Sequence, residues 1–158
     1  MKMFKRFAAA LLAGVMVLAM LTACGGNGGG GASLGEQLEN AMVDQINNVR
    51  SEGSEKLTND PTLRAQALAV LNKATADGKL KQVDITKNVL VMAEKGGPDE
   101  EGYYTLLAMT EENLANLKKP QKPDAKYDAI TAFGVATRVV NGKTYLAFAM
   151  TDSTQAQN

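Results

Sequence analysis

The sequence predicts an α+β fold, arranged as a three-layer α-β-α sandwich that ends in an antiparallel β-hairpin. Two segments in the first half, 34–49 and 61–74, repeat apolar residues at helical spacing. Two strand-like runs near the other end, 131–140 and 143–150, flank the turn dipeptide Asn141-Gly142. Helical and strand patterns therefore occupy different stretches of the chain, which is typical of an α+β domain.

The chain begins with the pattern of an export signal. Lys2, Lys5 and Arg6 precede an uncharged run of 17 residues, Phe7–Ala23. As a helix this run spans roughly 25 Å, which is short for a hydrocarbon core of ~30 Å. A basic start, a short apolar core and small residues before a cleavage site describe a secretory signal peptide. We therefore expect residues 1–23 to be removed from the mature protein.

A lipid-attachment motif closes the apolar run. Leu21-Thr22-Ala23-Cys24 resembles the lipobox of bacterial lipoprotein precursors, which consists of Leu, two small residues and Cys. The resemblance implies cleavage before Cys24, thioether lipidation of Cys24 and acylation of the new amino terminus. We expect the protein to be lipid-anchored at the extracytoplasmic face of the cell membrane, on the cell surface or in the periplasm. A plain membrane helix or a buried free cysteine is the alternative.

Charge and composition exclude several classes of function. The chain has 17 basic and 17 acidic side chains, and loss of the signal leaves 14 and 17, a net charge of −3. Without a basic patch, nucleic acid is not an expected partner. The chain has no His and one Cys, so it has no Ser-His-Asp triad, Cys-His dyad, HExxH zinc site or internal disulfide. We expect no cofactor, no metal site and no catalytic residues.

The mature chain is predicted to contain one domain. Residues 24–33 are the lipidated Cys and a glycine-rich tether, with an r.m.s. reach of roughly 15–18 Å. The tether lacks the preceding strand and the GK[ST] ending of a phosphate loop. The folded domain is expected over residues 34–150. The polar residues 151–158 are expected to form a flexible tail.

Two amphipathic helices open the domain. The first is predicted from a stripe formed by Leu34, Leu38, Met42, Ile46 and Val49. Asp60 is a suitable N-cap for the second helix, and Pro61 suits its first turn. The apolar face of the second helix extends to Ala74, and Gly78 is expected to end it.

The middle of the chain contains shorter elements. The apolar run 88–93 predicts a buried strand, and 95–102 predicts a loop. Residues 103–109 favour a strand over a helix because they begin with two Tyr and a Thr. Thr110 and the two acids after it open a short helix, which Pro120 closes.

The turn at Asn141-Gly142 sets the register of the closing hairpin. Pairing outward from it places Val139 opposite Thr144 and Phe133 opposite Met150. One face of the pair is then mostly apolar, and the other carries small residues: Gly134, Ala136, Ala147 and Ala149. Small residues predict close helix packing on that face as well. A sheet covered on both faces gives the three layers.

Several motifs occur in a family-like order. Ile46-Asn47-Asn48-Val49-Arg50 ends the first helix, Leu57 follows in a short loop, and Asp60-Pro61-Thr62-Leu63 starts an Ala-rich helix. Gly134-Val135-Ala136 and Tyr145-Leu146-Ala147-Phe148 lie in the closing strands. This order resembles the CAP (SCP-like) superfamily of cysteine-rich secretory proteins, antigen 5 and pathogenesis-related proteins. The resemblance implies an α-β-α sandwich with a central cleft.

The same resemblance implies a cleft with two His and two acidic residues that bind a metal. This chain has no His and lacks that site in its usual form. Residues 86–89, Thr-Lys-Asn-Val, correspond to the family's Gly-Glu-Asn-hydrophobic segment, so only Asn88 carries over. We expect Asn88, Tyr103 and Glu112 to line the remaining cleft.

Three functions are compatible with these patterns. The favoured one is a non-catalytic, CAP-like binding or interaction domain, whose partner is a surface protein, an envelope component or a small apolar ligand. The second is an envelope-acting hydrolase that uses carboxylates, Lys or Tyr, among them Lys87, Asp99, Glu111 and Glu112. The third is a structural lipoprotein with an unrelated α+β fold.

Overall fold

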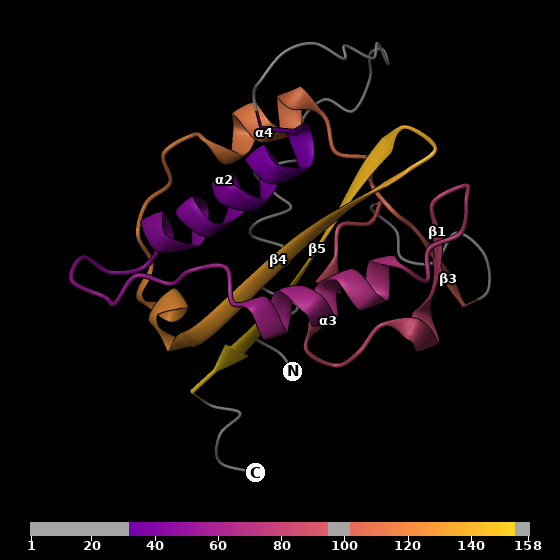
Figure 1. Cartoon of the computed structure of the whole chain (residues 1–158). Coiled ribbons are helices and arrows are strands. Elements are labelled where there is room, and N and C mark those ends of the chain that lie inside the picture. The colour runs from indigo at the N-terminus through magenta and orange to yellow at the C-terminus, as the bar shows by residue number, and fades with distance from the viewer. Residues whose placement is uncertain (1–31, 95–101, 154–158) are drawn as a thin grey trace.

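A three-stranded antiparallel sheet with helices around it organises the mixed α+β fold (Figure 1). The structure is a computed structural model that describes residues 32–94 and 102–153. Cys24, the predicted signal peptide and most of the tether lie outside the described residues, as do 95–101 and 154–158. The elements are α2 (Leu34–Val49), α3 (Pro61–Leu71), β1 (Lys79–Lys81), η1 (Gln82–Asp84), β2 (Val89–Val91), β3 (Tyr103–Thr105), α4 (Glu111–Leu117), η2 (Ala125–Ala129), β4 (Ile130–Val140) and β5 (Lys143–Asp152).

The main sheet has the strand order β2-β5-β4. β4 and β5 pair antiparallel on either side of Asn141-Gly142, and both turn residues have positive φ, 49° and 74°. The register pairs Val139 with Thr144 and Phe133 with Met150, as the turn predicts. β5 continues through Asp152, beyond the predicted domain end at residue 150.

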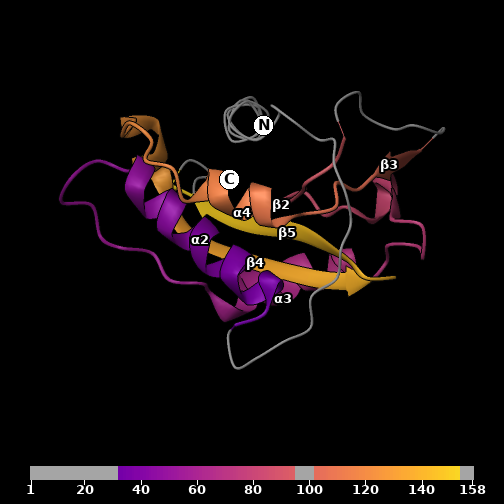
Figure 2. The same ribbon diagram turned by 90° about the horizontal axis from the view of Figure 1, so that it is seen from above.

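Helices lie on both faces of the main sheet. α2 and α4 cover the face that carries the larger side chains, among them Phe133, Val135, Leu146, Phe148 and Met150. α3 covers the face with Ala136, Ala147 and Ala149. Figure 1 shows α2 and α4 on one side of the β4–β5 ribbon and α3 on the other, and Figure 2 again shows α4 beside α2. The small residues therefore admit a helix, as their pattern predicts.

The helix starts follow from local capping. The Ser33 and Glu36 side chains form a capping box at the start of α2. Asp60 accepts a hydrogen bond from Leu63 N at 2.8 Å, and Pro61 occupies the first position of α3, as predicted. Thr110 caps α4 in the same way as Ser33 caps α2.

α3 ends earlier than its apolar stripe predicts. It stops at Leu71, whereas the stripe extends to Ala74 and the expected stop is Gly78. Arg138 Nη1 donates to Leu71 O at 2.7 Å and so satisfies a carbonyl at the end of the helix. Thr75 Oγ1 then accepts from Lys79 N at 3.0 Å and turns the chain into β1. Gly78, with φ of 82°, lies in that turn.

The segment 103–109 forms a shorter strand than the sequence predicts. Only β3 is regular, and it pairs with β1 in a separate two-stranded sheet. Leu106 packs in the core under α3, whereas Met109 packs in the core under α2 and α4. Leu107 packs against the core under α2 and α4, and Ala108 packs against the core under α3, so successive side chains from 106 to 109 alternate between the two cores. Outside β3 the backbone of this segment pairs only as single bridges, Leu106 with Ala93 and Met109 with Thr144.

Candidate functional site

A groove of about 320 Å³ lies between α2 and the end of α4. We call it the α2–α4 groove, and its lining is Gln37, Asn40, Ala41, Asp44, Asn48, Leu117 and Lys118. The lining residues of α2 recur at steps of three and four, so they share one face of the helix. Its volume is within the range of ~300–1,000 Å³ that is usual for ligand pockets.

Leu114 and Leu117 hold α4 against α2. They are 3% and 5% exposed and belong to the core that includes Leu38 and Met42 of α2. The position of this short helix therefore depends on two apolar anchors. Since α4 forms one wall of the α2–α4 groove, the same anchors determine the width of the groove.

The lining of the α2–α4 groove is mixed, with polar side chains beside the apolar Ala41 and Leu117. Asn40, Asp44 and Asn48 are exposed, and no hydrogen bond to another described residue engages their side chains. Gln37 Nε2 donates to Ala32 O at 2.9 Å, where the chain enters α2. An amide both donates and accepts hydrogen bonds, and Lys118 adds a cation at the α4 wall. The groove can therefore hydrogen-bond a ligand with hydroxyl or amide groups and also offers it apolar contacts.

The three residues expected to line the cleft belong to separate elements. Asn88 precedes β2, and its Nδ2 donates to Gln66 Oε1 of α3. Tyr103 lies in β3, where Lys81 Nζ is 5.9 Å from the centre of its ring. Glu112 is exposed in the first turn of α4. Asn88 therefore bonds to the helix on one face of the sheet, and Glu112 belongs to a helix on the other face.

None of these three residues is among those that line the α2–α4 groove. The sequence signal for the groove was a polar stripe, Gln37, Asn40, Asp44 and Asn48, beside the apolar stripe of the same helix. Such a stripe is also typical of any solvated helix face, so it does not by itself predict a groove. Only the position of α4 distinguishes a groove from an ordinary surface.

A buried polar cluster joins α2, α3 and β4. Glu39, which is 8% exposed, accepts from Arg64 Nε at 2.9 Å and from Arg64 Nη2 at 3.1 Å. It also accepts from Thr137 N at 2.9 Å and from Thr137 Oγ1 at 3.0 Å. The hydrogen bond to Glu39 raises the pKa of the Arg64 guanidinium. Asn59 adds to the cluster by bonding Val135 N at 2.8 Å and Val135 O at 3.0 Å.

This cluster occupies the outer edge of β4. Asp60 N donates to Phe133 O at 2.9 Å, next to the positions that Asn59 and Glu39 occupy. An edge strand otherwise presents unpaired N–H and C=O groups that invite association with other chains. The side chains of Glu39 and Asn59 therefore take the place of a further strand, and we assign them a structural role.

A second polar cluster forms around Asp128. Its carboxylate accepts from Ser51 N at 2.8 Å, from Ser51 Oγ and from Ser54 Oγ at 3.0 Å. The pKa of the Asp128 carboxyl is lowered, mainly by the hydrogen bond that the Ser51 hydroxyl donates to it. Arg50 Nη1 donates to Glu55 O, so this buried arginine bonds to a carbonyl. The cluster ties the loop after α2 to η2, and with no His in the chain it has no imidazole to activate a hydroxyl.

A metal-ligand cluster and a membrane-spanning helix are both absent from the described part of the chain. Within residues 32–94 and 102–153, no three His, Cys, Asp or Glu side chains gather as a metal ion would require. No helix in these two ranges is long and apolar enough to cross a membrane. No family model, no curated protein and no solved structure matches this chain.

Proposed function

We propose that this protein is an extracytoplasmic lipoprotein, anchored through lipidated Cys24, whose CAP-like domain binds a partner and does not catalyse a reaction. The observation that carries the proposal is Leu21-Thr22-Ala23-Cys24 at the end of an apolar run of 17 residues. Ser33 caps α2 only a short tether after Cys24, so the domain begins directly behind the anchor.

The CAP-like part of the proposal has support from the motif residues. Asn47 Nδ2 donates to Leu57 O at 2.9 Å, and Leu57 N donates to Asn47 Oδ1 at 2.8 Å. Asp60 caps the helix that follows. These residues shape the loop between α2 and α3, and helices on both faces of one sheet are what an α-β-α sandwich requires. The motifs therefore have structural roles, which fits a relationship in fold.

The α2–α4 groove is the proposed binding site. Its exposed amides and its two charged side chains can hydrogen-bond a polar envelope component, such as a glycan with peptide branches, and Ala41 and Leu117 add apolar contacts. The hydrolase alternative has less support, because Glu111 and Glu112 are exposed side chains in the first turn of α4. Acids at that position commonly complement the helix dipole.

Replacement of Cys24 with Ser tests the anchor. We expect the Cys24→Ser precursor to keep residues 1–23 and to incorporate no acyl label, because Ser lacks the thiol that forms the thioether. Intact mass and metabolic labelling with palmitate provide the measurement. Thr22→Ser keeps a small residue in the motif and should be processed normally. A mature wild-type protein without lipid mass would refute the anchor.

Replacement of Asn40 and Asn48 together tests the groove. Each neutral hydrogen bond contributes about 1 kcal/mol, so the double change to Ala should weaken binding of soluble peptidoglycan fragments by roughly 30-fold. NMR titration of the wild-type and variant proteins measures the dissociation constants. Gln121→Ala removes an exposed amide outside the groove and should leave binding unchanged. If the double variant binds the fragments as tightly as the wild-type protein does, the groove is not the binding site. That result would leave the proposed lipid anchor unaffected.

A further inference from the structure

Two side chains of opposite charge line the α2–α4 groove without pairing with each other. Asp44 belongs to α2, and Lys118 is the C-cap residue of α4. Both are exposed, and neither side chain forms an ion pair or a hydrogen bond with another described residue. In the segment that follows α4, by contrast, Lys126 Nζ lies 2.6 Å from Asp124 Oδ2. The groove therefore presents one anionic and one cationic group to a ligand.

The fold holds the two walls of the groove in place and leaves the charged ends free. Leu117, directly before Lys118, packs in the core together with residues of α2. After α4 the chain reaches the other end of α2, where Asp124 N donates to Val49 O at 2.8 Å. The backbone around Lys118 is thus attached to α2 on both sides, while its ammonium group stays exposed.

The rest of the lining also fits a peptide. Asn40 lies four residues before Asp44 and Asn48 four residues after it, so exposed amides flank the acid on one helix face. A side-chain amide donates and accepts hydrogen bonds, as a peptide bond does, so the two groups are complementary. Ala41 and Leu117 add apolar surface for methyl groups such as that of alanine.

A glycan would use less of this lining than a peptide branch. N-acetylated sugars carry hydroxyl and acetamido groups but no ammonium, and their lactyl carboxyl group is an amide once a peptide is attached. Asp44 and Lys118 would then lose hydration without gaining an ion pair. A peptide branch that contains a diamino acid and a free carboxyl end provides both charges.

We propose that the α2–α4 groove binds the peptide branch of a cell-wall glycopeptide, with the ammonium of its diamino acid at Asp44 and its terminal carboxylate at Lys118. This inference rests on the binding function proposed above and names the part of the envelope component that is recognised. Asn40 and Asn48 bond to the peptide backbone between the two charges. The apolar part of the lining contacts alanine methyl groups.

Synthetic peptides that lose one charge at a time test the proposal. The reference probe is N-acetyl-alanyl-isoglutaminyl-lysyl-alanyl-alanine, which has one ammonium and one carboxylate. Acetylation of its lysine or amidation of its carboxyl end should each weaken binding roughly three- to fivefold, the effect usual for an exposed ion pair. NMR titration of the mature lipoprotein in detergent micelles measures the dissociation constants. The disaccharide of the same glycopeptide, without peptide and with its lactyl group amidated, should bind at least about tenfold more weakly.

Variants of the two charged residues assign each ligand charge to one side chain. Asp44→Asn should weaken binding of the reference peptide roughly three- to fivefold. It should bind the lysine-acetylated peptide as tightly as the wild-type protein does, because that pair is already absent. Lys118→Gln should behave in the same way towards the reference and the amidated peptide.

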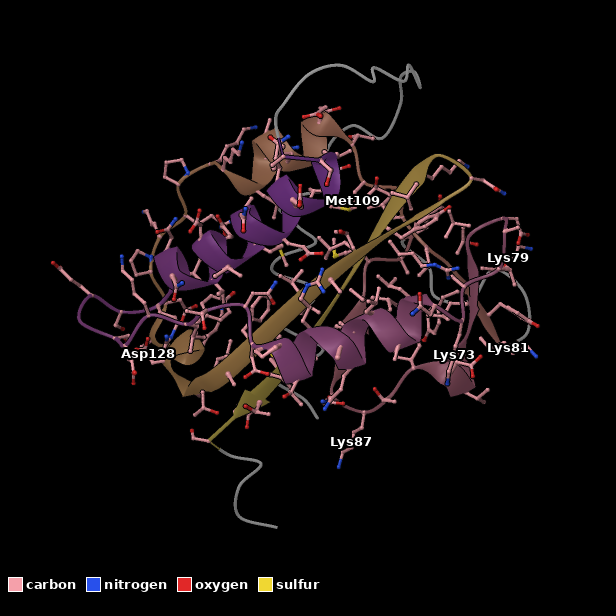
Figure 3. The ribbon with its side chains drawn as sticks, viewed as in Figure 1. Lys73, Lys79, Lys81, Lys87, Met109 and Asp128 are labelled. Atoms are coloured by element: carbon pink, nitrogen blue, oxygen red, sulfur yellow. The ribbon has the colours of Figure 1, made fainter. Side chains whose placement is uncertain are left out.

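Control variants make the same charge changes outside the groove. Lys87→Gln removes an exposed cation that Figure 3 shows on the side of α3, away from α2 and α4. Glu94→Gln removes an exposed acid beside β3, where Glu94 N donates to Thr105 O at 2.9 Å. Both should leave peptide binding unchanged.

Two results would overturn the proposal. Equal affinities for the reference, acetylated and amidated peptides would show that the groove does not recognise their charges. Tighter binding of the disaccharide than of the peptides would assign the groove to the glycan. In either case, weaker binding by the variant with Asn40→Ala and Asn48→Ala would keep the groove as the binding site. A wild-type protein that binds no peptidoglycan fragment would instead refute the proposed binding function itself.

Discussion

We expect Gly134→Ala to lower the free energy of unfolding by about 3 kcal/mol, the upper part of the range for overpacking. A Cβ at Gly134 would lie 2.6 Å from the carbonyl carbon of Leu63 and closer still to Arg64 N. Carbon atoms prefer separations of about 3.5–4.0 Å, so these contacts overlap. The atoms belong to the backbone of α3 and have no rotamer by which to avoid the clash. α3 must move away from β4, which opens the core beneath it.

Urea denaturation followed by circular dichroism measures this change, since the chain has no Trp to report unfolding. The melting temperature should fall by roughly 10 °C. Val139→Ala provides a control on the same strand, because Val139 is 64% exposed and its truncation should change stability by no more than about 0.5 kcal/mol. A Gly134→Ala variant as stable as this control would mean that α3 does not pack closely on the strand.

The β4–β5 pair and its small-residue face were predictable from sequence because the information is local. Asn141-Gly142 admits positive φ at both positions, and a two-residue turn leaves one register for the strands that it joins. Once the register is set, alternation assigns Gly134 to the face that α3 covers. The same local logic predicted the Asp60 cap of α3.

The middle of the chain was less predictable because its partners are distant in sequence. Tyr103–Thr105 pairs with β1, whereas Leu106 and Met109 each enter a different core. Alternation along 106–109 is a local pattern, but it does not show which backbone the segment pairs with. The partners are β1 for 103–105 and single bridges from Leu106 to Ala93 and from Met109 to Thr144. The early end of α3 has a similar cause, because Arg138 of β4 supplies the partner for Leu71 O.

The candidate site required the tertiary structure. Asn40 and Asn48 belong to a polar helix face that becomes a groove only where α4 packs beside it. Asn88, Tyr103 and Glu112 were grouped through the CAP resemblance, and the structure places them on different elements. The motif residues of the loop between α2 and α3 have clear structural partners, so the resemblance was more informative about local structure than about the site.

We expect Glu39→Ala to lower the free energy of unfolding by about 2 kcal/mol. Removal of one partner from a buried ion pair costs roughly 3–5 kcal/mol, but the Arg64 side chain is 42% exposed and water can solvate it after the change. The remaining cost arises at β4, where Thr137 N and Oγ1 lose their acceptor. Urea denaturation measures the total. Arg64→Ala should cost about 1–2 kcal/mol, because it leaves the sheet edge covered but deprives the buried Glu39 carboxylate of its cation.

Amide hydrogen exchange distinguishes two roles of Glu39, covering the edge of β4 and pairing with Arg64. If Glu39 mainly covers the edge of β4, exchange at Thr137 should accelerate in Glu39→Ala and remain slow in Arg64→Ala, since only the first change removes the acceptor of that N–H. An ion-pair role predicts instead that both variants behave alike and that salt abolishes their difference from wild type. Unchanged exchange at Thr137 in Glu39→Ala would reject the edge role. Faster exchange there would show that a carboxylate on α2 protects a sheet edge as a further strand would.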